Sequence, residues 1–137
     1  MTVSVTELAE EIQRLFAQKN DSERERVRFI FEQLRSELSA GRVRAAEPDP
    51  SAPTGWKVNT WVKQGILLGF RAGEISVYPS THKDMPYLDK DTLPLRSLDA
   101  KSGIRVVPGG SSIRDGAYIG AGVICMPPMY INIGAYV

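Results

Sequence analysis

The sequence predicts an α+β protein, with an N-terminal helical α/β domain over residues 1–102 followed by the first coils of a left-handed parallel β-helix over residues 103–137. Two observations support this division. Residues 1–40 carry eight acidic and six basic side chains, whereas residues 103–137 carry three charged side chains and seven of the twelve glycines. The spacing of the aliphatic residues also changes, from a helical repeat in the first region to a six-residue repeat in the last.

Two amphipathic helices are predicted at the N-terminus, over about residues 4–18 and 22–40. Each begins with a capping-box pattern, a serine followed three residues later by a glutamate, and Gly41 is placed to end the second helix. Apolar residues then recur at the spacing of one helix face. The serine–glutamate pairs are Ser4 with Glu7 and Ser22 with Glu25, and the apolar residues are Leu8, Ile12, Leu15 and Phe16, then Val27, Ile30, Phe31, Leu34 and Leu38.

A third helix is predicted over about residues 56–72, because apolar residues fall four apart and Gly73 can end the helix. Short strands are predicted at residues 43–47 and 75–78. The segments around the prolines of residues 48–53 and 79–100 are expected to be irregular, since proline fixes φ and removes an amide donor. The four-apart residues of the third helix are Val58, Val62, Ile66 and Phe70.

The last third of the chain shows a six-residue repeat. Residues 113–118 and 119–124 are consecutive units that each begin with isoleucine and carry a small or β-branched residue four positions later. A third unit begins at Cys125, and the pattern resumes at Ile133. An aliphatic leader every six residues, with glycines at the corners, is the hexapeptide signature of a parallel β-helix, in which three units make one coil.

Composition excludes several classes of function. With 17 basic and 16 acidic residues the net charge is +1, so no basic surface for nucleic acid or anionic lipid is expected. The single cysteine, Cys125, leaves no cysteine cluster for zinc and fits a reducing cytoplasm. Apolar runs such as residues 66–68 are far too short to span a membrane. The acidic N-terminus differs from a signal peptide, so a cytoplasmic protein is predicted.

Several side chains that could carry chemistry are interpreted as structural. His82, the only histidine, lies in a polar loop and is expected at the surface. Cys125 occupies a repeat leader position and is expected inside the coil. Residues 109–112 resemble a phosphate-binding loop but lack the following lysine and helix. Arg24, Arg26 and Arg28 alternate with glutamates and indicate a solvated helix face. Three aromatic residues are expected to join the N-terminal domain to neighbouring elements: Trp56, Trp61 and Phe70.

Three segments resemble tetrahydrodipicolinate N-succinyltransferases. They are Gly55 to Arg71 (GWKVNTWVKQGILLGFR), Gly103 to Pro108 (GIRVVP), and Met126-Pro127 continuing to Tyr130 to Val137 (YINIGAYV). Their order and spacing resemble the N-terminal half of a family member, which belongs to the hexapeptide-repeat acyltransferases. The resemblance implies succinyl transfer from succinyl-CoA, as co-substrate, to the amine of tetrahydrodipicolinate, in the diaminopimelate route to lysine. It also implies homotrimers formed through the β-helix, with no permanently bound cofactor and no metal.

Arg105 is the one substrate-binding residue that the resemblance carries onto this sequence. It matches the arginine with which the family binds a substrate carboxylate, and a planar guanidinium can hold a carboxylate through two parallel hydrogen bonds. Pairing with a helix acid is the alternative interpretation of Arg105. The catalytic acids of the family are expected beyond Val137, so no catalytic residue is assigned within the chain.

The roughly two coils in residues 103–137 are fewer than the three or so repeats that usually stand alone. We therefore expect this chain to be a fragment that is inactive by itself, either a split or cleaved half whose partner supplies the remaining coils or an incomplete piece of a longer protein. Two other interpretations stay open. The chain could be a non-catalytic oligomerisation or regulatory module, or it could belong to another hexapeptide acyltransferase. Further hexapeptides with an acidic pair, encoded downstream or on a companion chain, would favour the enzyme.

Overall fold

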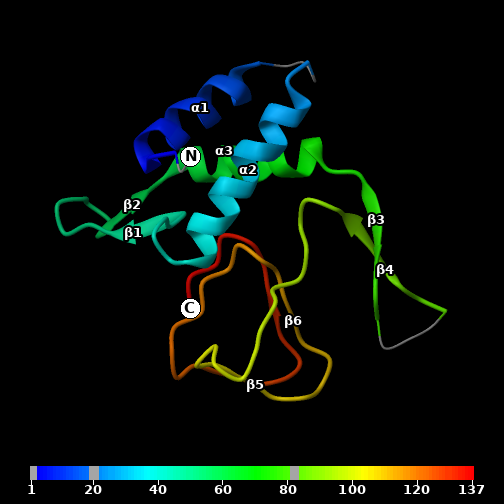
Figure 1. Ribbon diagram of the computed structural model, residues 1–137. Coiled ribbons are helices and arrows are strands. Elements are labelled where there is room, and N and C mark those ends of the chain that lie inside the picture. The colour runs from blue at the N-terminus through cyan, green and yellow to red at the C-terminus, as the bar shows by residue number, and fades with distance from the viewer. Residues whose placement is uncertain (1–2, 19–21, 81–83) are drawn as a thin grey trace.

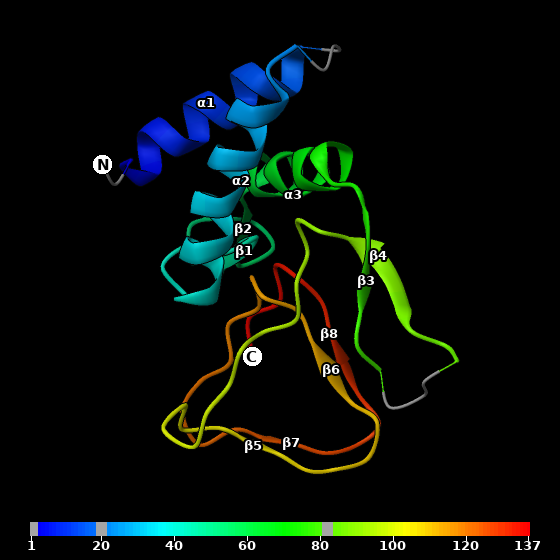
Figure 2. The ribbon, with the colours of Figure 1, turned by 45° about the vertical axis from the view of Figure 1, so that its right-hand side comes forward.

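The computed structural model describes residues 3–18, 22–80 and 84–137. Within them helices and short strands are combined (Figure 1), as the predicted α+β class requires. The helices gather at one end, a three-sided coil of chain forms the other, and a hairpin projects beside them (Figure 2). The elements are α1 (Val5–Ala17), α2 (Arg24–Ser39), β1 (Ala46–Pro48), β2 (Trp56–Val58), α3 (Thr60–Ala72), β3 (Ile75–Tyr78), β4 (Tyr87–Lys90), β5 (Arg105–Val106), β6 (Ser112–Ile113), β7 (Ile124–Cys125) and β8 (Tyr130–Ile131).

The first helix begins at the predicted capping box. The Ser4 hydroxyl accepts a hydrogen bond from the Glu7 amide at 3.3 Å, and a Glu7 carboxylate oxygen accepts one from the Ser4 amide at 2.9 Å. These two bonds pair amides that have no partner inside the helix. The predicted apolar stripe buries Leu8, Ile12 and Leu15 completely.

The second helix keeps its predicted stripe but not its predicted start. Its N-cap is Glu23 rather than Ser22, and Glu23 makes no side-chain capping bond. The third residue after that cap is Arg26, whose Nε donates to Glu11 of α1 at 2.9 Å, so a contact with the neighbouring helix replaces the capping box expected there. The five predicted stripe residues are all buried: Val27, Ile30, Phe31, Leu34 and Leu38.

The third helix is shorter than predicted, and its buried face matches the predicted stripe only in part: Val62 is fully buried and Ile66 packs against the core. Residues 56–58 form strand β2, which pairs antiparallel with β1, so the helix begins at Thr60. Phe70 of the predicted stripe is 38% exposed. The buried face also contains two glycines that bring α3 close to α2. A Cβ on Gly65 would lie 2.4 Å from Leu34 Cδ2, and one on Gly69 would lie 2.4 Å from Phe31 Cε2.

A hairpin follows the third helix. Strand β3 forms at the predicted residues 75–78 and pairs antiparallel with β4, which lies in a segment that the sequence predicts to be irregular. Ile75, Val77 and Leu88 share its outer face and are all more than 60% exposed. The opposite face looks toward the coil, because Asp89 of β4 contacts Arg114 beyond β6.

The chain after residue 103 winds into stacked coils. Strand β5 pairs parallel with β7, β6 pairs parallel with β8, and an isolated parallel bridge joins Tyr118 to Tyr136. Each pairing steps about 18 residues along the chain, which is three six-residue units. The six-residue repeat predicts parallel pairing between successive coils, and the structure confirms it. These residues form neither a helix nor an antiparallel hairpin with one another.

The coil has its own apolar interior and shares a second core with the helices. Its interior is a cluster of buried residues, and Ile133 of the second coil joins the helical core. The Ser39 hydroxyl at the end of α2 donates to Asp115 at 2.7 Å and accepts from the Gly116 amide at 2.7 Å. The coil is thus fixed to the end of α2. The interior residues are Ile113, Ala117, Ile119 and Cys125.

Candidate functional site

Arg105, the predicted substrate-binding residue, lies in β5 on the outside of the first coil. Its amide donates to the Val123 carbonyl at 3.0 Å, which fixes the backbone to the second coil. The side chain is exposed and makes no ion pair or hydrogen bond with any residue in the described part of the chain. The alternative, pairing with a helix acid, is therefore not what the described residues show. Such a guanidinium can bind a carboxylate without first breaking another ion pair.

The glycines near Arg105 set the corners of the coil. Gly103, two residues earlier, has φ of +71° and its carbonyl accepts from the Gly122 amide at 2.7 Å. Such positive φ values are strained for residues with a side chain. The expected loop after β5 is present at Gly109 and Gly110, both with positive φ, and it ends at Ser112, where β6 begins.

Other candidate residues from the sequence include a cysteine, a histidine and two tryptophans. Cys125 is 6% exposed inside the coil, which confirms its interior position. His82 lies outside the described residues. Trp56 is 53% exposed on β2, so a contact of this ring with neighbouring elements stays a prediction, whereas Trp61 packs against the helical core. Within the described residues no group of three or more histidine, cysteine, aspartate or glutamate side chains is placed to hold a metal ion.

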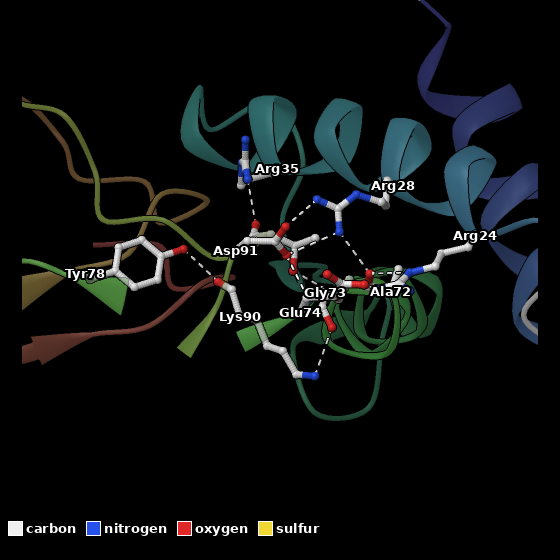
Figure 3. A network of polar contacts seen from close by, with 11 residues as sticks. Arg24, Arg28, Arg35, Ala72, Gly73, Glu74, Tyr78, Lys90 and Asp91 are labelled. Carbon is white, nitrogen blue, oxygen red and sulfur yellow. Dashed lines mark hydrogen bonds and ion pairs between the residues drawn. The ribbon is translucent and has the colours of Figure 1, made fainter. Parts of the chain in front are cut away.

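A polar junction that sequence patterns do not predict joins α2, α3 and β4 (Figure 3). Arg24 and Arg28 are predicted on a solvated helix face, but both donate to the Ala72 carbonyl at the end of α3, at 3.1 and 2.9 Å. This carbonyl has no partner inside the helix and carries the negative end of its dipole, so cations are favourable there. Arg28 also binds Asp91, at 2.6 Å between Nη2 and Oδ2. The two arginines lie four residues apart, about one helical turn, and this spacing could have predicted that they act on the same group.

Asp91 is the anionic centre of that junction. The Arg28 guanidinium, and next the Glu74 amide that donates to Asp91 Oδ1 at 2.9 Å, lower the pKa of this carboxyl from its usual value to about 2. Because the folded state lowers the pKa, Asp91 stabilises the fold above the pKa of the unfolded chain, near 4, and this contribution disappears as the pH falls toward 2.

We expect the Asp91→Asn variant to be less stable than the parent at pH 7, with a difference that shrinks between pH 4 and pH 2. Urea unfolding followed by circular dichroism at both ends of this range measures it. Asp84→Asn, at an exposed aspartate, is the matched control for the removal of one negative charge. A stability difference for Asp91→Asn that stays constant from pH 7 to pH 2 would contradict the assignment.

The comparisons with known proteins agree with one another. Residues 7–72 match the family model described as tetrahydrodipicolinate N-succinyltransferase N-terminal. This region contains all of α2 and α3 and most of α1, and therefore the helical packing described above. No helix in the described part of the chain is both long and apolar enough to cross a membrane.

Full-length relatives match a larger part of the chain than the family model does. Three of them carry the name 2,3,4,5-tetrahydropyridine-2,6-dicarboxylate N-succinyltransferase. The protein from Xylella fastidiosa (strain Temecula1) is 40% identical over 104 residues, covering 73% of this chain and 35% of the relative. The proteins from Herminiimonas arsenicoxydans and Granulibacter bethesdensis are 38% and 36% identical, covering 80% and 90% of this chain and 39% and 45% of themselves. The chain thus spans less than half the length of these relatives.

Proposed function

We propose that this chain is the N-terminal part of a tetrahydrodipicolinate N-succinyltransferase, which acts in the diaminopimelate route to lysine. The match of 73–90% of the chain to relatives of that name is the observation that carries the proposal. The co-substrate is succinyl-CoA and the acceptor is the amine of tetrahydrodipicolinate. The enzyme needs no permanently bound cofactor, and its proposed location is the cytoplasm.

The proposed reaction sets out what the protein must supply. The acceptor amine attacks the thioester carbonyl of succinyl-CoA, the new C–N bond forms, the C–S bond breaks, and the amine proton is transferred so that coenzyme A leaves as a thiol. The amine must be deprotonated and held close to the carbonyl carbon. Acids outside residues 1–137 are proposed for the proton transfer, and residues within the chain for holding the dicarboxylate.

Arg105 is the residue that we assign to the dicarboxylate. Its guanidinium is exposed and without a partner among the described residues, and its strand is held by the second coil. A two-point contact with one carboxylate would fix the acceptor at the first coil, and lysine cannot reproduce that contact.

Residues 103–137 are proposed to be the start of a left-handed parallel β-helix, and residues 1–102 to be the N-terminal domain. The parallel pairings with a step of about 18 residues support this proposal. Strand β8 and Tyr136 lie on the second coil, and a further coil could pair with this edge. In the proposed enzyme the later coils complete the active site and form the homotrimer.

The proposed role of Arg105 is tested by Arg105→Lys in the complete enzyme. We expect KM for the dicarboxylate to rise about tenfold or more, because a charged hydrogen bond contributes about 1.5–3 kcal/mol, while KM for succinyl-CoA changes little. Arg42→Lys is the control, since Arg42 is an exposed arginine whose partner, Glu37, lies in α2. Unchanged KM values in Arg105→Lys would remove Arg105 from the site.

A further inference from the structure

A pocket lies between the hairpin and the coil, and the strands of the coil that line it, β6 and β8, differ from β5, which carries Arg105. Its volume is about 290 Å³, close to the lower limit for small-molecule sites. Strands β3 and β4 form one wall, and β6, β8 and Leu95 form the other. Three of its lining residues are tyrosines. The full lining is Tyr78, Tyr87, Leu88, Asp89, Leu95, Ser112, Arg114 and Tyr130.

The charged groups of this pocket are one guanidinium and one carboxylate, already paired with each other. Arg114 donates from Nη2 to Asp89, from Nη1 to the Leu93 carbonyl, and from Nε to the Tyr130 hydroxyl. The Arg114 side chain is 14% exposed, so its position is fixed by packing as well as by these bonds. A guanidinium has five N–H donors, and three of them bind residues in the described part of the chain. Two donors remain for a ligand.

The carboxylate also keeps capacity for a ligand. Asp89 accepts from Arg114 at Oδ2 and from the Lys90 amide at Oδ1, 2.8 Å away. An ionised carboxylate has about four acceptor positions, so two remain. A ligand with a cation and an anion can therefore bind both side chains without breaking the existing ion pair.

The remaining wall offers exposed aromatic and apolar surface. Tyr87 is 51% exposed and Tyr130 is 57% exposed, although both line the pocket. The Tyr78 hydroxyl donates to the Lys90 carbonyl at 2.7 Å, which holds its ring in place, and burial raises its pKa. These rings suit a small apolar group.

We propose that this pocket binds a free α-amino acid with an apolar side chain, as a zwitterion. Its carboxylate would meet the free N–H groups of Arg114, its ammonium the free lone pairs of Asp89, and its side chain the tyrosine rings. A simple anion would leave its charge facing Asp89, and a simple cation would leave its charge facing Arg114. This proposal is independent of the proposed acyl transfer.

The test is calorimetric titration of the full chain with L-phenylalanine and two analogues that each lack one charge. We expect 3-phenylpropionate and phenethylamine to bind at least tenfold more weakly than L-phenylalanine. Equal binding of 3-phenylpropionate would show a plain anion site, and equal binding of phenethylamine a plain cation site. Either result, or no binding of the amino acid at millimolar concentrations, would overturn the proposal.

Two variants place the ligand in this pocket. Tyr87→Ala removes an exposed ring and should weaken L-phenylalanine binding about two- to tenfold, the equivalent of about 0.5–1.5 kcal/mol for one ring contact. Trp56→Ala, which removes a similarly exposed ring from β2, should leave the affinity unchanged. Loss of binding in Arg105→Lys without loss in Tyr87→Ala would place the ligand at the proposed acyl-acceptor site and overturn the assignment.

Discussion

Replacing Phe31 with alanine is expected to lower the free energy of unfolding by about 3–5 kcal/mol, the usual cost of removing a buried phenylalanine. Phe31 is 2% exposed in the helical core, and its ring lies directly against the backbone of α3 at Gly69. The loss would be seen as a lower midpoint in urea with an unchanged slope. A loss below about 1 kcal/mol would mean that α2 and α3 do not pack through this ring.

A double-mutant cycle tests the contact itself. Gly69→Ala alone should destabilise, because its Cβ would lie 2.4 Å from Phe31 and overpacking costs about 1–3 kcal/mol, of which helix propensity returns about 1 kcal/mol. In a Phe31→Leu background the same change should cost less, since the ring is gone. Gly65→Ala is the matched control, because its Cβ would meet Leu34 and Ile12 instead. The Phe31→Leu background should not reduce the destabilisation caused by Gly65→Ala.

The third helix shows why sequence periodicity predicts some faces and misses others. In α2 the buried stripe consists of large apolar residues, so hydrophobic spacing identified it. In α3 two contact positions are Gly65 and Gly69, which carry no hydrophobic signal, and the four-apart series pointed to a face that includes the exposed Phe70. The residues that permit the closest helix packing are therefore those that a hydrophobicity pattern does not register.

The sequence predicted the backbone pairing of the coil but not the ion pairs that the coil and the helices form. A six-residue period follows from local geometry, and it predicted the parallel pairing and the interior position of Cys125. The pairs formed by Arg114 with Asp89 and by Arg28 with Asp91 join segments far apart in the sequence. Nothing in their local pattern marks them, because each depends on how the hairpin packs against the helices and coil. The pocket between the hairpin and the coil depends on the same packing, so no local pattern marks it either.

Gly116→Ala should be among the most damaging changes in the coil. Gly116 has φ of +92°, which costs a residue with a side chain about 1–3 kcal/mol, and its Cβ would lie 2.5 Å from Ile133 Cγ1 of the second coil, adding about 1–3 kcal/mol for overpacking. Gly122→Ala is the matched control, since Gly122 has φ of +84° but an added Cβ there would meet nothing within 4 Å, so it carries only the backbone cost. The difference in unfolding free energy between the two variants therefore measures how closely Ile133 of the second coil packs on Gly116 of the first, and equal losses would mean that this contact is absent.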